Sequence, residues 1–122
     1  MERRSFVPRY ELLERKRRQL LAHLAQIRSL RRGYLNKRFN VCGKPDCRCK
    51  AKPPKLHGPY FFITTKVQGK TRCTYIEDRS RLPLLREQLR AHQRFRRLVQ
   101  GFVGVCEQIA ELELHQQKGV QK

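Results

Sequence analysis

Apolar residues recur at helical spacing near the start of the chain. They are Val7, Tyr10, Leu13, Leu20, Leu24 and Ile27, with Arg17 interrupting the series. Because a helix brings positions three and four apart onto one face, this spacing predicts a helix over residues 8–31. Gly33 follows, where a glycine commonly ends a helix.

A longer apolar repeat occupies the last third of the chain. Its positions advance by four and three residues in turn: Ala91, Phe95, Leu98, Phe102, Val105, Ile109 and Leu112. This coiled-coil spacing predicts a helix over residues 80–114, with Asp78 or Ser80 as its cap. Gly101 and Gly104 interrupt the helix at a cost of about 1 kcal/mol each relative to alanine, which indicates either a close helix–helix approach or a kink.

Between the two helical regions the pattern becomes that of strands. Residues 33–40 alternate apolar and polar side chains. Residues 60–65 are aromatic and β-branched, and after a turn at residues 68–70 the return strand of a hairpin is expected over residues 71–76. One face of the aromatic strand should pack on the helices. The other face either belongs to the core as well or stacks on bases.

These elements predict an α+β fold in one domain over residues 1–122. Two long helices with coiled-coil-like packing flank a Cys/His loop and β-hairpin segment over residues 33–77, and residues 115–122 form a flexible tail. Only 39% of the residues are hydrophobic, so a self-sufficient core would be thin. A metal, a partner helix or a second subunit would help to stabilise it. We expect a homodimer.

Positive charge is the strongest compositional signal. The 122 residues include 29 Lys and Arg against 10 Asp and Glu, a formal net charge of +19. From Arg15 to Arg72 there are seventeen basic residues and one acid, Asp46. Such charge repels itself in a compact state, and phosphate groups relieve the repulsion with release of counterions. We therefore expect a nucleic-acid partner, with DNA favoured and RNA possible.

The expected phosphate contacts come from the first helix, the central loop and the hairpin tip. They are Arg15, Lys16, Arg17, Arg18, Arg31, Arg32, Lys37, Arg38, Lys44, Arg48, Lys50, Lys52, Lys55 and Lys70. A membrane surface is a weaker alternative. No apolar run approaches the roughly 18 residues that a membrane span requires, and the N-terminus lacks an apolar signal core. We expect a cytoplasmic, nucleoid-associated protein.

Three cysteines and one histidine stand within sixteen residues of this basic segment. The spacing Cys-x4-Cys-x-Cys-x7-His joins Cys42, Cys47, Cys49 and His57, a donor set that suits one tetrahedral zinc ion. Cys73 on the return strand competes with His57 for the fourth position. Four protein ligands would leave no open coordination position, so the site is expected to be structural and the chain not to be an enzyme. The alternative is a set of reduced loop cysteines without metal.

Three other functions remain open from the residues alone. The chain could be an RNA-binding or ribonucleoprotein subunit, which would be equally basic. It could be an adaptor whose C-terminal heptads recruit a larger enzyme. It could also be an enzyme that uses Cys47 or Cys49 as a nucleophile, which thiol alkylation in the presence of zinc would test.

The motifs also resemble those of a known family. The string Cys42-Gly-Lys-Pro-x-Cys47-Arg48-Cys49, then His57-Gly58-Pro59-Tyr60, Gly69-Lys70-Thr71 and Tyr75-Ile76, is similar to small bacterial and archaeal proteins of unknown function. The resemblance covers residues 30–112 and favours His57 over Cys73 as a ligand. The genes of such proteins often accompany mobile elements, which implies an accessory protein of transposition, recombination or regulation. The loop over residues 50–56 departs from the family pattern.

Overall fold

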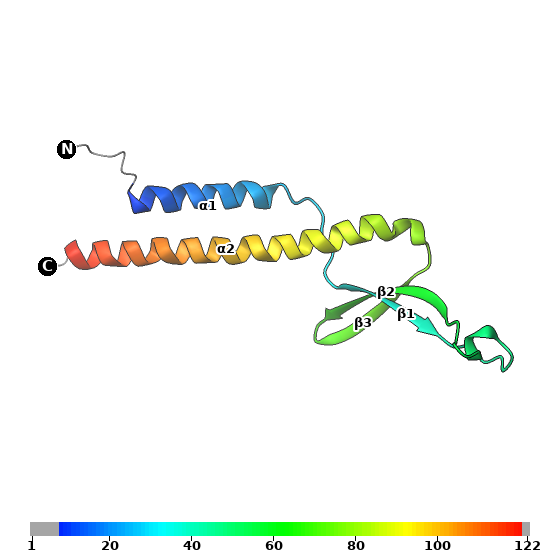
Figure 1. The fold of residues 1–122 in the computed structure, drawn as a ribbon. Coiled ribbons are helices and arrows are strands. Elements are labelled where there is room, and N and C mark those ends of the chain that lie inside the picture. Colours follow the sequence, from blue (N-terminus) through cyan, green and yellow to red (C-terminus); the bar gives the residue numbers. More distant parts are fainter. Residues whose placement is uncertain (1–7, 121–122) are drawn as a thin grey trace. The chain divides into compact units, whose positions relative to one another are not determined.

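The computed structural model describes residues 8–120, and the side chains of residues 8–116. Within these residues, two helices, three strands and two short 3-10 turns follow one another (Figure 1). In order they are α1 (Arg9–Ala25), β1 (Tyr34–Asn40), η1 (Arg48–Lys50), β2 (His57–Val67), β3 (Lys70–Ile76), η2 (Arg79–Arg81) and α2 (Leu82–Val120). The predicted α+β class is confirmed, and the strands form one antiparallel sheet. The chain divides into two compact units, one helical and the other spanning Leu30–Arg90.

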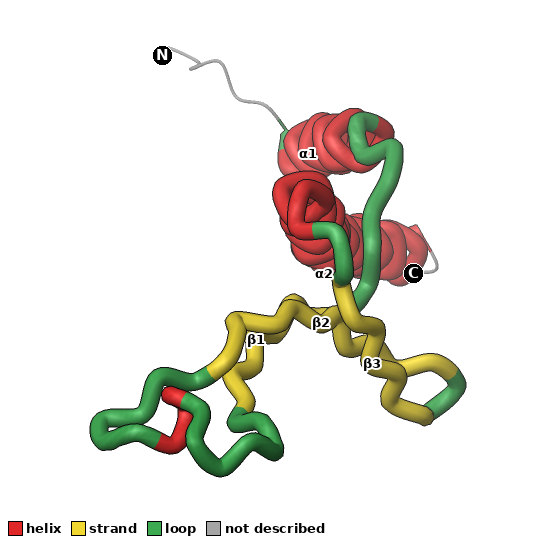
Figure 2. Tube along the Cα trace, turned by 90° about the vertical axis from the view of Figure 1, so that its right-hand side faces the viewer, coloured by secondary structure: helices red, strands yellow, loops and turns green. Residues whose placement is uncertain are grey.

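The helical unit pairs α1 with the part of α2 from Ala91 onward (Figures 1 and 2). The start of α1 contacts the later turns of α2, so the two helices run side by side in opposite directions. Leu13, Val105 and Ile109 form the buried cluster between them, and Leu20 and Leu112 pack against it. The later heptad positions of α2 are therefore used in packing against α1.

Helix α1 ends at Ala25, before the predicted boundary at residue 31. The backbone N–H groups of Gln26 and Ile27 bond to carbonyls three residues back, a tightening that is common at a helix end. Arg31 then bonds to Gln88 through both its backbone N–H and its Nε, each at 3.0 Å. These contacts with α2 replace the helical bonds that the periodicity had predicted for this segment.

Helix α2 has 39 residues and continues to Val120, past the predicted end at residue 114. Glu111 and His115 lie one turn apart, with 3.3 Å between carboxylate and ring nitrogen, as in a continuing helix. The expected tail over residues 115–122 is thus helical to Val120, and its last two residues lie outside the described residues. At the other end, Asp78 caps the η2 turn before the helix by accepting bonds from the Ser80 N–H and hydroxyl.

The sheet has the order β1-β2-β3. Tyr34 pairs with Thr64 and Asn40 with His57 on one side of β2, and Val67 pairs with Lys70 on the other. A two-residue turn joins β2 to β3, and both of its residues have positive φ, as a type I′ hairpin turn requires. The predicted hairpin is confirmed, and residues 33–40 add the third strand to it.

Gly33 stands at the entry to β1 instead of ending α1. Its φ is +125°, and a Cβ there would lie 2.7 Å from the carbonyl oxygen of Thr64. Only glycine satisfies both the backbone angle and this close approach to β2.

Candidate functional site

The four candidate ligands belong to the segment that connects β1 to β2. Cys42 follows β1 by two residues, and His57 is the first residue of β2. Because Asn40 pairs with His57, the sheet holds the two ends of the segment side by side. Cys47 and Cys49 lie at and within the η1 turn. We call residues 41–57 the knuckle.

The knuckle turns sharply between its second and third cysteines, as the Cys-x-Cys spacing requires for one ion. The Cys47 carbonyl accepts a bond from the Lys50 N–H at 2.9 Å, and the Arg48 carbonyl accepts one from Ala51 at 3.0 Å. Lys50 also donates through Nζ to the carbonyls of Cys42 and Lys44. Its ammonium group is thus engaged with the knuckle backbone, where the sequence predicted a phosphate contact.

The ligand atoms of Cys42, Cys47, Cys49 and His57 all lie within 4.8 Å of one another. The Sγ atoms of Cys42 and Cys49 are 3.7 Å apart, and Cys47 Sγ is 3.2 Å from His57 Nε2. A tetrahedral zinc ion with Zn–S bonds of about 2.3 Å separates two sulfurs by about 3.8 Å. Cys49 is 2% exposed. The four residues are close enough to hold a metal ion, and the separation of the Cys42 and Cys49 sulfurs matches that of two thiolates on zinc.

The thiols differ in acidity. The pKa of Cys47 is lowered from 9.0 to about 6, chiefly because the Cys49 backbone N–H bonds to its sulfur and further because Cys42 and His57 bond to it. The pKa of Cys42 is raised. Although the Lys44 backbone N–H favours its thiolate, burial and the neighbouring thiols Cys47 and Cys49 together outweigh that effect. Cys47 is therefore a thiolate at neutral pH, the form that a metal binds.

Cys73 lies outside the cluster. Its Sγ is 3.3 Å from Thr64 Oγ1 and 3.4 Å from an Arg38 guanidinium nitrogen, both on the sheet. The competition between His57 and Cys73 that the sequence left open is thus decided by position, since His57 is the residue that groups with the other three ligands.

Three groups of basic residues bear on the predicted phosphate contacts, and α1 carries the first. Arg15, Lys16 and Arg18 are exposed there, as the prediction of phosphate contacts requires. Arg17 is half-buried and pairs with Glu14 at 2.9 Å, one turn earlier. The block of four basic residues is therefore partly neutralised by an acid that lies just before it in the sequence.

The second group is on the knuckle, where Lys44, Arg48, Lys52 and Lys55 are exposed. The third lines a cleft of about 810 Å³ between the sheet and the first turns of α2, which we call the arginine cleft. Its guanidinium groups come from four residues of three separate segments: Arg31, Arg32, Arg72 and Arg81.

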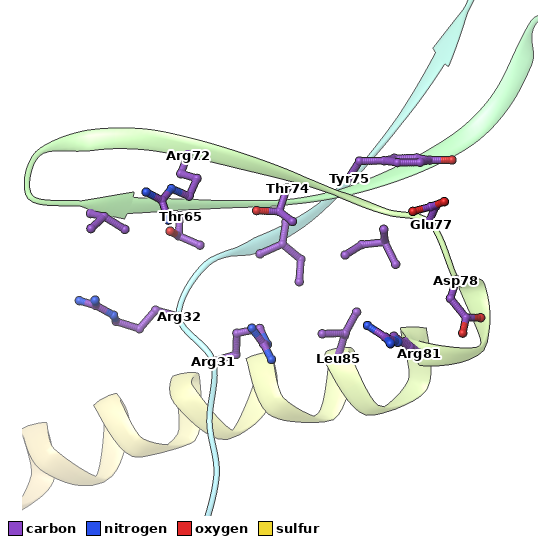
Figure 3. Close-up of a pocket in the computed structure, with 13 residues that line it drawn as sticks. Arg31, Arg32, Thr65, Arg72, Thr74, Tyr75, Glu77, Asp78, Arg81 and Leu85 are labelled. Carbon is purple, nitrogen blue, oxygen red and sulfur yellow. The ribbon is translucent and has the colours of Figure 1, made fainter.

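Figure 3 shows the arginine cleft with Thr65 and Thr74 on the sheet side and Leu85 on the α2 side. Glu77 and Asp78 lie at one end, and the Asp78 carboxylate is occupied by Ser80. The sequence predicted phosphate contacts for Arg31 and Arg32 in the loop but not for Arg72 and Arg81. For Arg72 a signal existed, because it alternates with Thr74 and Ile76 along β3 and so shares their face of the sheet.

Other predicted phosphate contacts lie on the sheet. Lys37 and Arg38 are neighbouring residues of β1 and therefore point to opposite faces. Lys70 begins β3, next to the hairpin turn. All three are exposed.

The fold and the site thus define an α+β protein that has a Cys3His cluster and exposed basic groups beside it. Residues 10–91, more than half of the chain, match the family described as a domain of unknown function, DUF6788, and the protein belongs to that family. The match contains the whole knuckle and all four arginines of the cleft. Neither a curated protein nor a solved structure matches the chain. Over the described residues, neither helix combines the length and hydropathy needed to cross a bilayer.

Proposed function

We propose that this protein binds nucleic acid, with DNA as the favoured partner, as an accessory protein of a mobile element or a regulatory system. The observation that carries the proposal is the arginine cleft, where four guanidinium groups line one cavity with two threonine hydroxyls. Arginine presents a planar fork of donors that suits phosphate oxygens. The net charge of +19 acts in the same direction over a longer range.

We further propose that the knuckle holds a structural zinc ion. Three thiolates and one imidazole complete a tetrahedron and leave no open position for a substrate. The ion would hold the exposed Lys44, Arg48 and Lys55 at fixed places on the knuckle. Because the chain has a thin core, metal binding would contribute to folding of this segment.

Salt-dependent binding of fluorescent DNA duplexes tests the main proposal. A double Arg72→Gln, Arg81→Gln variant should lose affinity and flatten the slope of log K against log salt by about 2, near 0.9 for each phosphate that is no longer neutralised. Arg94→Gln combined with Arg96→Gln is the matched control, since both residues are exposed on α2 and the change in charge is equal. Affinity that is insensitive to salt in the unaltered protein would contradict nucleic-acid binding. Competition with RNA of the same sequence decides between the two polymers.

A second candidate function is self-association or partner recruitment through α2. Phe95 and Val103 are 38% and 48% exposed and line a shallow groove together with Val99. Replacing both exposed residues with glutamine should convert a dimer to a monomer in sedimentation experiments. Deleting residues 98–122 is a poorer test because it removes Val105 and Ile109, which are buried against α1.

A further inference from the structure

One face of the sheet carries the aromatic rings of Tyr34, Tyr60, Phe62 and Tyr75. The register places Asn36, Phe62 and Tyr75 in one row across the three strands. The adjoining rows bring Tyr34 beside Thr64 on one side and Arg38 beside Tyr60 on the other. Because side chains alternate along a strand, these residues belong to the face opposite Ile63, although Tyr75 also borders the arginine cleft (Figure 3). We call them the aromatic face.

The two faces of the sheet differ in burial. Ile63, on the opposite face, is 5% exposed, and Leu85 of α2 lies toward that side (Figure 3). Tyr34 and Tyr75, on the aromatic face, are 67% and 50% exposed. The fully buried residue of the sheet therefore lies on the Ile63 face, which also carries Phe61, whereas the exposed tyrosines lie on the aromatic face.

The rings of the aromatic face lie close to one another. The centroids of Phe62 and Tyr75 are 5.4 Å apart, and those of Tyr60 and Tyr75 are 6.4 Å apart. The Arg38 guanidinium carbon lies 4.5 Å from the centre of the Phe62 ring, within cation–π range. A row of aromatic and guanidinium groups of this kind offers flat, polarisable surfaces at neighbouring positions.

The charge on these strands has one sign. The three strands contain Lys37, Arg38, Lys66, Lys70 and Arg72 and no aspartate or glutamate. Arg38 and Lys66 share the aromatic face, by the alternation of β1 and β2. Aromatic rings bordered by cations complement a strand of bases joined by phosphates.

We propose that the aromatic face stacks the bases of a single-stranded nucleic-acid segment. The proposal rests on the proposed function and narrows its substrate class. A duplex keeps its bases stacked on each other, so only unpaired bases can lie flat on Tyr75 or Tyr34. The lysine and arginine side chains contact the flanking phosphates, while the rings contact bases of any identity.

Tyrosine fluorescence can detect stacking of bases on the aromatic face. It has no tryptophan and four tyrosines, and three of these, Tyr34, Tyr60 and Tyr75, lie on the aromatic face. The fourth, Tyr10, is in α1. In a Tyr10→Phe background all tyrosine emission therefore comes from the aromatic face, and stacked bases should quench it.

The experiment titrates this protein with oligothymidylate and with an abasic deoxyribose-phosphate strand of the same length. We expect quenching with the first and none with the second, although both should bind at low salt. Tyr75→Leu should weaken oligothymidylate binding about tenfold, and Tyr75→Phe should retain it, because phenylalanine keeps the ring. Tyr10→Leu in the unaltered background is the matched control and should bind normally.

The outcomes separate this inference from the function on which it rests. If both strands bind equally, without quenching and without an effect of Tyr75→Leu, the aromatic face does not stack bases while nucleic-acid binding stands. If neither strand nor duplex binds, the proposed function fails first. If Tyr75→Leu changes the mass of the free protein in sedimentation, a second copy covers the face, and the inference is overturned.

Discussion

Leu20 of α1 faces Gly101 of α2, and a Cβ on that glycine would lie 3.6 Å from the leucine Cδ2. This is an ordinary van der Waals distance, so the two helices approach closely without requiring glycine. Gly104, one turn further on, would place a Cβ in open space. Of the two alternatives, a close helix–helix approach or a kink, the approach is found at Gly101, while no described residue lies against Gly104.

Replacing Gly104 with alanine should raise the free energy of unfolding by about 1 kcal/mol. Alanine removes the helix-propensity penalty of glycine, and the structure has room for the methyl group. Thermal or urea unfolding followed by circular dichroism measures the change. Gly101→Ala should give a gain of the same sign. A loss at Gly104 would mean that a second copy of the chain packs there.

Replacing Gly33 with alanine should have the opposite effect and destabilise the sheet by roughly 1–3 kcal/mol. The φ of +125° disfavours any side chain, and the added Cβ would overlap the Thr64 carbonyl oxygen. The same unfolding measurement reports the loss. Unchanged stability would show that β1 does not approach β2 this closely.

Truncating Leu13 to alanine should cost about 2–5 kcal/mol, because the side chain is buried and its removal leaves a cavity. Leu13 is 4% exposed and packs with Val105 and Ile109. Leu12→Ala serves as the control, since Leu12 is 45% exposed on the same helix and should cost far less. Equal effects at the two positions would contradict the observed face of α1.

The purified protein should contain one zinc ion per chain, measured by elemental analysis and native mass spectrometry. Cys49→Ser should abolish binding, because the sulfur is buried within 4.8 Å of the other three ligand atoms. Cys73→Ser should retain the full metal content, since Cys73 lies on β3 outside the cluster. A chelator should lower the melting temperature of the unaltered protein and leave that of Cys49→Ser unchanged.

In the chelated protein, Cys47 should react with iodoacetamide at lower pH than Cys42. The pKa of Cys47 is lowered to about 6, chiefly by the Cys49 backbone N–H, while the pKa of Cys42 is raised. Mass-spectrometric mapping between pH 5 and 9 measures both rates.

A lowered pKa also links Cys47 to stability. Its contribution is complete above the ordinary value of 9.0 and is lost as pH falls through about 6. The stability of the chelated protein should therefore decline from pH 9 to pH 6. Identical iodoacetamide labelling profiles for Cys47 and Cys42 would contradict the difference in acidity on which both expectations rest.

Helices and hairpin could be predicted because each depends on local periodicity. The heptad positions Val105 and Ile109 are buried as expected, and the strand over residues 71–76 lies within β3. The end of α1 could not be predicted, because Arg31 bonds to Gln88, a residue far away in the sequence. Long-range pairing of this kind overrides the local preference for helix.

The two candidate sites also differ in how far the sequence predicts them. The metal ligands could be predicted because they lie close together in the sequence and their spacing is typical of a metal site. The arginine cleft could not, because Arg32, Arg72 and Arg81 come together only when β3 and the η2 turn are in place. The distribution of charge along the sequence indicates basic segments but not which of them share a cavity.

The pairing of Asn40 with His57 holds the two ends of the knuckle at a fixed separation. Both ends of the segment are anchored by the sheet, so the distance it must close does not depend on what lies inside. The stretch between Cys49 and His57 can therefore gain or lose residues at a small entropic cost. A change of length or charge in this stretch should therefore leave the fold and the four ligands in place.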